Sequence, residues 1–165
     1  MPWVTLSLLD RLLSVPEDKG RVRAASLEDL KVSLRRDLNY LLNTPKPAHS
    51  EVEGRLVLPG TLLNFGISEF VGIDIADPGA QTRIAVAIEQ AIRAFEPRLT
   101  DVSVTPVLEE NVPDRSRGNP ATPLQLTFRV RAEFHYHPAR ERIHFQAVLE
   151  GGTGRFEPGE ILSDA

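Results

Sequence analysis

The stretch Phe95-Glu96-Pro97-Arg98-Leu99 marks the point at which one periodic pattern ends and another begins. Over residues 84–95, apolar side chains recur every three or four positions, which predicts one buried face of a helix. Pro97 has no amide hydrogen to donate, so the helix cannot continue through it. Beyond it, Val102 and Val104 alternate with polar residues, as in a half-buried strand. The stretch therefore predicts a corner between a helix and the first strand of a sheet.

Two opposite charges flank that proline. The C-terminal end of a helix carries partial negative charge, so Arg98 is well placed there, whereas Glu96 requires a compensating cation. A helix end with two solvated charges would show the same residues, and exposed ion pairs contribute only about 0–1 kcal/mol to stability. We expect the pair to be exposed and to face a partner, since complementary charges across an interface can contribute far more. On this interpretation, Arg98→Ala leaves the midpoint of thermal unfolding almost unchanged.

Two helices are expected before the sheet. Ser26-Leu27-Glu28-Asp29 has the form of a helix start, with an acceptor side chain followed three residues later by a carboxylate. A second start lies at Asp77-Pro78, where an N-cap residue precedes proline at the first helical position. The first helix ends at Asn43-Thr44-Pro45. Its leucines recur on one face, which indicates packing against a core; they are Leu27, Leu30, Leu34, Leu38 and Leu41.

Three strands are expected to follow, over about Leu99–Leu108, Leu124–Tyr136 and Ile143–Leu149. The second shows the clearest alternation of apolar and polar side chains. The expected fold is α+β, with the helices packed on one face of a three-stranded antiparallel sheet and the other face wet. If Pro138–Glu141 forms the loop between the second and third strands, Phe134 lies opposite Phe145. A one-residue shift would turn apolar side chains to the wet face. The expected core under the helices contains Phe128, Phe134 and Phe145.

The chain has the length and composition of a single globular domain. Its 165 residues suffice for a sizeable core, and 25% charged with 41% hydrophobic residues is ordinary. The net charge of −4 gives no reason to expect nucleic-acid binding. No cysteine is present, which excludes disulfides and thiolate metal sites. The apolar segment Val4–Leu13 lacks a basic leader and is interrupted by Asp10 and Arg11, so we expect a cytoplasmic chain without membrane insertion.

Four stretches, in order along the chain, resemble the TssE family of type VI secretion baseplate proteins, which is itself similar to a wedge protein of contractile phage tails. They are Ser7-Leu8-Leu9-Asp10-Arg11-Leu12, Asp37-Leu38-Asn39-Tyr40-Leu41-Leu42-Asn43-Thr44, Leu63-Asn64-Phe65-Gly66 and Glu96-Pro97-Arg98. Tyrosine is expected in place of Phe65 in many relatives, a difference that concerns packing. The resemblance extends from about Ser7 to about Leu149, which is nearly the whole chain.

The resemblance implies a structural, non-enzymatic component of the wedge of a six-fold baseplate. It implies contacts with the other wedge proteins and with the contractile sheath subunit. It also implies a domain similar to part of that subunit, which lets the protein template the first sheath ring. Physically, an exposed strand edge can accept a strand from an incoming subunit. No cofactor is implied, and the expected partner-binding residues are Leu9, Leu12, Glu96, Pro97 and Arg98.

The chain is expected to divide into an N-terminal docking segment, a baseplate-wedge α+β domain and a flexible C-terminal tail (residues 1–25, 26–150 and 151–165). Leu9 and Leu12 are expected to lie on the apolar face of a short amphipathic helix in the first part. That face either docks onto a neighbour or packs on its own domain. Two loops are expected where proline and glycine are frequent, at residues 44–60 and 111–122. The tail begins with Gly151-Gly152-Thr153-Gly154.

A second class of function is a peptidoglycan glycosidase, because proteins resembling this chain have been labelled lysozyme-like. Such an enzyme needs a protonated acid and a second carboxylate about 5–9.5 Å away. A neighbouring cation favours the ionised form of a carboxyl group, and Arg98 lies beside Glu96. No other acid is linked to Glu96 by a recognisable spacing, so we expect no catalytic residues.

A third possibility is a metal-bound binding module. His135, His137 and His144 all fall on the polar face of the predicted sheet, and the expected register places His135 opposite His144. Imidazoles in this arrangement could ligate zinc. No residue is identifiable that would orient the rings, and a wet sheet face near a hairpin end accounts for the same residues. We therefore expect no metal site.

Overall fold

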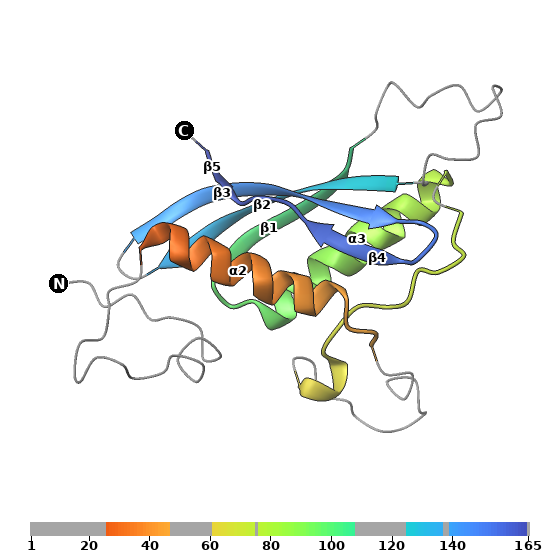
Figure 1. The fold of residues 1–165 in the computed structure, drawn as a ribbon, viewed down its shortest axis with the longest axis horizontal. Coiled ribbons are helices and arrows are strands. Elements are labelled where there is room, and N and C mark those ends of the chain that lie inside the picture. The colour runs from red at the N-terminus through yellow and green to blue at the C-terminus, as the bar shows by residue number, and fades with distance from the viewer. Residues whose placement is uncertain (1–25, 47–60, 75, 108–124, 137–138, 165) are drawn as a thin grey trace.

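The computed structural model describes residues 26–46, 61–74, 76–107, 125–136 and 139–164. Within these residues, two helices lie against one antiparallel sheet, as Figure 1 shows. The helices are α2 (Leu27–Leu42) and α3 (Pro78–Phe95), with a short 3-10 turn, η2 (Leu62–Asn64), between them in sequence. The strands are β1 (Leu99–Pro106), β2 (Gln125–Tyr136), β3 (Ala139–Glu150), β4 (Arg155–Pro158) and β5 (Leu162–Ser163).

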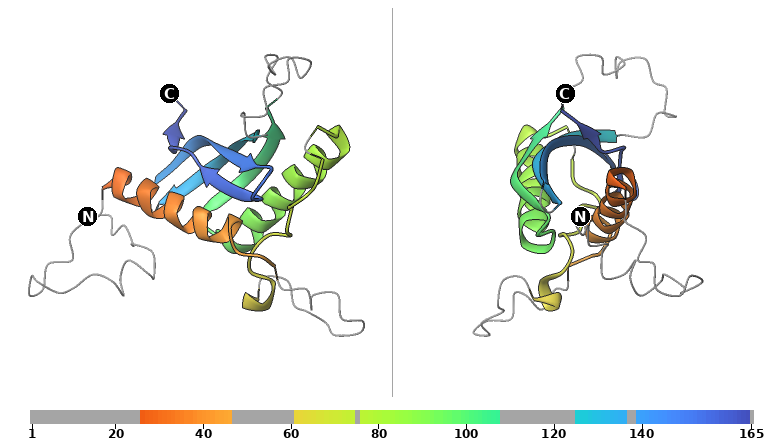
Figure 2. Two further views of the ribbon diagram at one scale, coloured as in Figure 1. Left: turned by 45° about the vertical axis from the view of Figure 1, so that its right-hand side comes forward. Right: turned by 90° about the vertical axis from the view of Figure 1, so that its left-hand side faces the viewer.

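Both helices pack under the same face of a curved sheet. The strand order is β1-β2-β3-β4, and β5 also pairs with β3, beyond the end of β4. Helix α3 lies along β1, and α2 lies along β4 (Figure 2). The expected α+β class is confirmed. The expectation of three strands is wrong, because the residues after Leu149 add β4 and β5 to the sheet.

The helix starts form as their sequences predict. At α2, the Ser26 hydroxyl accepts a hydrogen bond from the Asp29 N–H (3.1 Å), and the Asp29 carboxylate accepts one from the Ser26 N–H (2.9 Å). At α3, the Asp77 carboxylate accepts from the N–H groups of Gly79 and Ala80. The leucine face of α2 turns inward, with Leu30, Leu34, Leu38 and Leu41 all buried.

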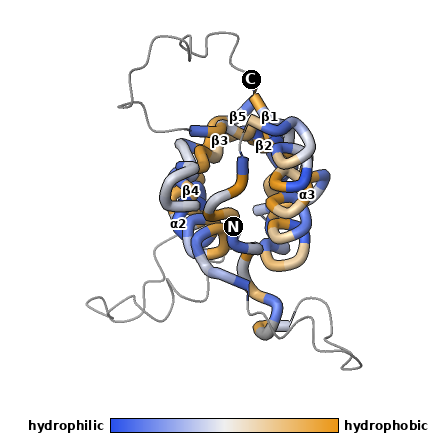
Figure 3. The backbone as a smooth tube through the Cα atoms, turned by 90° about the vertical axis from the view of Figure 1, so that its right-hand side faces the viewer, coloured by the Kyte–Doolittle hydropathy of each residue, from blue (hydrophilic) through white to orange (hydrophobic). Residues whose placement is uncertain are grey.

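The core lies between the sheet and the two helices. Viewed end-on in Figure 3, strands β1, β2 and β3 lie above, and α2 and α3 lie on opposite sides beneath them. Alternate residues of β2 and β3 point into this space, as the period-two pattern predicts. Its largest side chains are fully buried phenylalanines, namely Phe128, Phe134, Phe145 and Phe156.

A β-bulge interrupts the alternation at the start of β1. The pairing of β1 with β2 shifts between Thr100 and Ser103. Asp101, within the bulge, has a φ of 49°, in the left-handed region that aspartate tolerates better than branched residues do. The extra residue explains why Leu99 and Val102, an odd number of positions apart, are both buried.

The hairpin between β2 and β3 has a different register from the expected one. Phe134 lies opposite Glu141 rather than Phe145, and Tyr136 lies opposite Ala139. Only residues 137–138 separate the paired strands, so the expected loop over Pro138–Glu141 is wrong. The register differs by four positions, an even number, and the same side chains still face the core. The alternating pattern therefore could not distinguish the two registers.

The C-terminal segment is part of the sheet instead of the expected flexible tail. Leu149 pairs with Phe156 in β4, and Ile143 pairs with Ser163 in β5. Phe156 and Ile161 are buried in the core. A strand of four residues is too short to show a periodic pattern, so its burial depends on neighbours that are distant in sequence. Residues 1–25, with the expected docking segment, lie outside the described residues.

Candidate functional site

Arg98, at the corner between α3 and β1, binds carboxylates from two different elements. Its Nε and Nη2 atoms donate to the two carboxylate oxygens of Glu96, at 2.7 and 2.5 Å, in a bidentate pair. The same Nη2 donates to Oδ2 of Asp37 at 2.7 Å. Asp37 lies on α2, so Arg98 connects the corner to the other helix of the domain.

These charged groups are largely withdrawn from water. Glu96 is 5% exposed, and the side chains of Arg98 and Asp37 are 22% and 24% exposed. Burial alone would lower the pKa of Arg98, but the hydrogen bonds and charges of Glu96 and Asp37 outweigh it and raise that pKa above its ordinary value. The expectation of an exposed pair is therefore wrong, because α2 packs over the corner.

The ion pairs continue outward from Asp37 to Arg36. The Arg36 Nη2 atom lies 3.1 Å from Oδ1 of Asp37, and its side chain is 32% exposed. We call the four residues Arg36, Asp37, Glu96 and Arg98 the corner cluster. Pro97, between the two residues of the bidentate pair, is exposed. A partner can therefore reach Pro97 and the exposed fractions of the Arg36, Asp37 and Arg98 side chains, whereas Nη1 of Arg98 is buried.

A third segment packs beside the corner cluster, around the end of α3. The ring of Phe65 meets that of Phe95 edge-on, with centroids 5.2 Å apart. The Ile67 N–H donates to the carbonyl oxygen of Thr44 at 3.0 Å. Gly66 has a φ of 112°, and a Cβ there would lie 2.2 Å from the same oxygen, so only glycine fits. Three stretches of distant sequence therefore meet at this place.

Comparison with protein families matches residues 28–139 to the family described as baseplate wedge protein gp25. The chain belongs to this family. The resemblance to baseplate wedge proteins that the sequence suggests is thus confirmed, and it assigns the protein a structural role in a baseplate. The match runs from the first turn of α2 to the first residue of β3, and it includes the whole corner cluster. Comparisons with curated proteins and with solved structures gave no match.

The structure brings together three of the five residues expected to bind partners. Glu96, Pro97 and Arg98 lie at one corner of the gp25-family domain, whereas Leu9 and Leu12 lie outside the described residues. The sequence interpretation missed Asp37 as a ligand of Arg98. Asp37 belongs to one of the stretches that carry the resemblance, but nothing local indicates a contact across 61 residues.

Side chains of α3 bond the outer edge of β1, which is the first edge strand of the sheet in this gp25-family domain. On β1, the carbonyl oxygen of Val102 accepts from Nη2 of Arg93 at 2.7 Å. The N–H of Val104 donates to Oε2 of Glu89 at 3.3 Å. Glu89 and Arg93 are themselves an ion pair on α3, 2.8 Å apart. Two main-chain groups in the middle of β1 are thus already bonded by side chains of α3, which hinders the addition of another strand.

The opposite edge is closed by α2. The side-chain amide of Asn43 donates to the carbonyl oxygen of Phe156 (2.8 Å) and accepts from its N–H (3.0 Å), as a neighbouring strand would. Nε of Arg35 donates to the carbonyl oxygen of Pro158 at 2.9 Å. Within the described residues, the edge without such cover comprises β5 and residues Ala139–Glu141 of β3, which have a strand on one side alone.

The histidines do not form the pair expected from the sequence. His135 lies opposite Arg140 and His144 opposite Arg131, because the register differs from the expected one. Each of these two imidazoles has polar neighbours of its own, and His137 lies outside the described residues. In the described part of this gp25-family chain, no three histidine, aspartate or glutamate side chains are grouped as a metal would require.

The corner cluster is poorly suited to glycoside hydrolysis. A glycosidase requires one carboxyl group that holds a proton for the leaving group. Glu96 and Asp37 both accept hydrogen bonds from the guanidinium of Arg98, so the carboxylates of the cluster are occupied by an internal partner. The gp25 family is one of structural baseplate proteins, in accord with this geometry. Among the described residues, neither helix is long and apolar enough to cross a membrane.

Proposed function

We propose that this protein is a wedge component of a type VI secretion baseplate, which it joins to the contractile sheath. The observation that carries the proposal is the family match over residues 28–139. The type VI assignment draws in addition on the TssE-like stretches, three of which pack together around the end of α3. In this role the protein acts in the cytoplasm, in six-fold assemblies, without a cofactor.

The corner cluster is the proposed contact with the other wedge proteins. Arg98 is held in a fixed orientation by Glu96 and Asp37, so a partner binds a guanidinium that is already ordered. Pro97 fixes the backbone of the turn and is exposed between the two charged residues. Leu9 and Leu12 are proposed to dock onto a neighbouring wedge protein through an apolar helix face.

The proposed templating of the sheath uses the uncovered edge of the sheet. A strand from the first sheath subunit would pair alongside β5 and continue past residues Ala139–Glu141. This location is supported by the hydrogen bonds from α2 and α3, which cover β4 and β1.

The proposal is tested in the source cell with a fluorescent sheath subunit. Deletion of the gene should abolish the assembly of extended sheaths, and the parent protein supplied in trans should restore it. A variant that removes the exposed ring of the corner and its backbone restraint, Pro97→Gly, should restore fewer sheaths than a control with an exposed change on α3, Gln90→Ala. Normal sheath assembly in the deletion strain would refute the proposed role.

The proposed role also predicts that the protein lacks muramidase activity. Purified peptidoglycan should release no muropeptides with the parent protein or with Glu96→Gln, because both carboxylates of the corner cluster are bonded to Arg98 instead of being free to act on a substrate. The measurement is chromatography of the soluble products, with a known muramidase as positive control. Release that depends on Glu96 would favour a glycosidase over a structural protein.

A further inference from the structure

The outer face of the sheet carries three arginines without internal partners. Arg129 and Arg131 lie on β2, Arg142 lies on β3, and all three are exposed on the face opposite the helices. In the part of the chain that the structure describes, none of the three has a hydrogen bond or an ion pair from its side chain. The nearby carboxylate of Glu133 is occupied by His135 and Arg140 instead.

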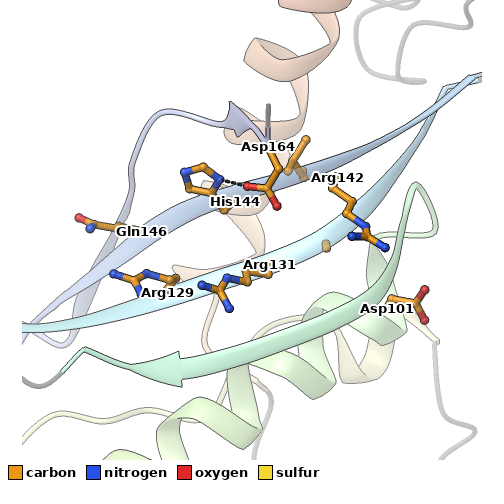
Figure 4. Close-up of a pocket in the computed structure, with 9 residues that line it drawn as sticks. Asp101, Arg129, Arg131, Arg142, His144, Gln146 and Asp164 are labelled. Carbon is orange, nitrogen blue, oxygen red and sulfur yellow. Dashed lines mark hydrogen bonds and ion pairs between the residues drawn. The ribbon is translucent and has the colours of Figure 1, made fainter.

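These arginines line a shallow depression of about 580 Å³ on the sheet surface. Figure 4 shows them in a row along the strands, with Arg142 set apart from Arg129 and Arg131, instead of converging on one point. Asp164 at the rim is bound to His144 at 2.6 Å, and Asp101 lies at one end of the row. The positive charges are therefore left available to an external ligand.

Their proximity opposes folding rather than supporting it. Residues two apart on a strand are separated by about 7 Å, and like charges on one face of a sheet repel. The chain as a whole carries a net charge of −4, so the row is not part of a generally basic surface. An unpaired row of like charges on an acidic protein indicates a ligand of opposite charge.

We propose that this arginine row, Arg129, Arg131 and Arg142, is a docking surface for an extended acidic segment of a partner protein. Side chains at alternate positions of an extended chain also recur at about 7 Å, so successive carboxylates can each meet one guanidinium. A single phosphate would require the guanidiniums to converge. A nucleic acid carries phosphates along its whole length, so it would meet the net negative charge of the domain over a larger surface than a short acidic segment on the arginine row would.

This surface is separate from the corner cluster and lies on the face of the sheet opposite the helices. The proposal therefore stands whether or not the baseplate belongs to a type VI system. It identifies the partner by its chemistry alone, as a polypeptide with carboxylates at alternate positions.

The test is fluorescence anisotropy of the full-length protein with a labelled peptide of about twelve residues that alternates glutamate and threonine. The matched peptide replaces glutamate with glutamine, and a DNA duplex of about 20 base pairs serves as the competing class of ligand. The acidic peptide should bind more tightly than either. Its affinity should fall as salt rises from about 50 to about 200 mM, because the contacts are exposed charges.

Reversing the charge of one arginine in the row then tests whether the acidic peptide binds there. Arg131→Glu should weaken binding of the acidic peptide at least about tenfold, whereas the control Arg83→Glu, on the exposed surface of α3, should change it less than about twofold. Arg142→Gln should give an intermediate loss, which provides a second measurement if Arg131→Glu fails to fold. Failure of the acidic peptide to bind at low salt, equal effects of the two reversals, or tighter binding of the DNA would each overturn the proposal.

Discussion

At Arg98, hydrogen bonds to two carboxylates replace the water that an exposed guanidinium would keep. Without a partner, the carboxylate of Glu96 would lower the stability of the fold, because it is only 5% exposed and lies near the negative end of the α3 dipole. The bidentate fork of Arg98 compensates both effects, and Asp37 holds the same guanidinium from the side of α2. Removing a single member of such a buried set leaves its partners uncompensated, which costs more than the set contributes when intact.

Arg98→Ala is therefore expected to destabilise the fold, by about 3 kcal/mol, in contrast to the sequence-based expectation of little change. The reason is that Glu96 would remain buried without a cation. Arg98→Lys should recover part of the loss, since an ammonium group supplies charge without the fork. Urea denaturation measures these differences, with Arg83→Ala as a matched exposed control. Equal stability of Arg98→Ala and the parent would show that water solvates Glu96 in its place.

At the scale of elements, α2 and β4 depend on each other. Asn43 ends the helix and bonds both main-chain groups of Phe156, whose ring is fully buried. Lys31, near the start of the same helix, is itself buried and donates to the hydroxyl of Ser163 on β5 at 2.6 Å. A helix that protects the edge of the sheet in this way also keeps β4 from pairing with another chain.

Asn43→Ala should cost about 1–3 kcal/mol, because two main-chain groups of Phe156 would lose their partners. It should also open the edge of β4. Size-exclusion chromatography over a range of protein concentrations should then show association that the parent lacks. Gln90→Ala, exposed on α3, is the control and should leave stability and size unchanged. If Asn43→Ala stays monomeric and fully stable, the buried ring of Phe156 is sufficient to hold β4 in place.

Phe134→Ala should destabilise the protein by about 3–5 kcal/mol, because the side chain is fully buried beneath the helices and its removal leaves a cavity. Urea denaturation gives the change in the free energy of unfolding. Tyr40→Ala, at a residue that is 55% exposed on α2, should stay within about 0.5 kcal/mol of the parent. A Phe134→Ala protein as stable as the parent would contradict the inward assignment of this face of β2.

At the scale of the whole molecule, the corner cluster is separate from two neighbouring surfaces, the uncovered edge and the arginine row. The corner cluster lies between the helices, the uncovered edge lies at β5, and the arginine row lies on the outer face of the sheet. In the proposed role the protein contacts the other wedge proteins and the sheath subunit, and a corner cluster that lies apart from the uncovered edge allows both contacts at once. Side chains of the helices and of Asn43 bond the other edges of the described sheet, which leaves one edge for the proposed strand addition.

Amide hydrogen exchange of the full-length protein should detect strand addition at the uncovered edge. Addition of the purified sheath subunit should slow exchange at residues 139–141 and 162–163, because an added strand would bond their outward main-chain groups. Exchange along β1 should stay unchanged, since Glu89 and Arg93 already bond its edge. Protection along β1 instead would place the added strand at the other edge of the sheet.

The sequence by itself determined the helices, the inward face of β2 and β3, and the family. Caps at Ser26 and Asp77, the leucine face and the strict alternation from Leu126 to Tyr136 are local patterns, and each depends on neighbours within a few residues. The family stretches are equally local. For these features, the backbone geometry of a helix or strand fixes in advance which positions share a face.

Only the tertiary structure decided the register, the C-terminal strands and the burial of Glu96. A register shifted by four positions keeps the same faces inward, so the alternation in the two strands could not select the observed pairing of Tyr136 with Ala139. Phe156 is buried because β3 and α2 flank it, and Glu96 is buried because Asp37 reaches Arg98 from 61 residues away. Contacts between distant segments produce no periodic pattern in the sequence of either segment, because such contacts depend on how whole elements pack.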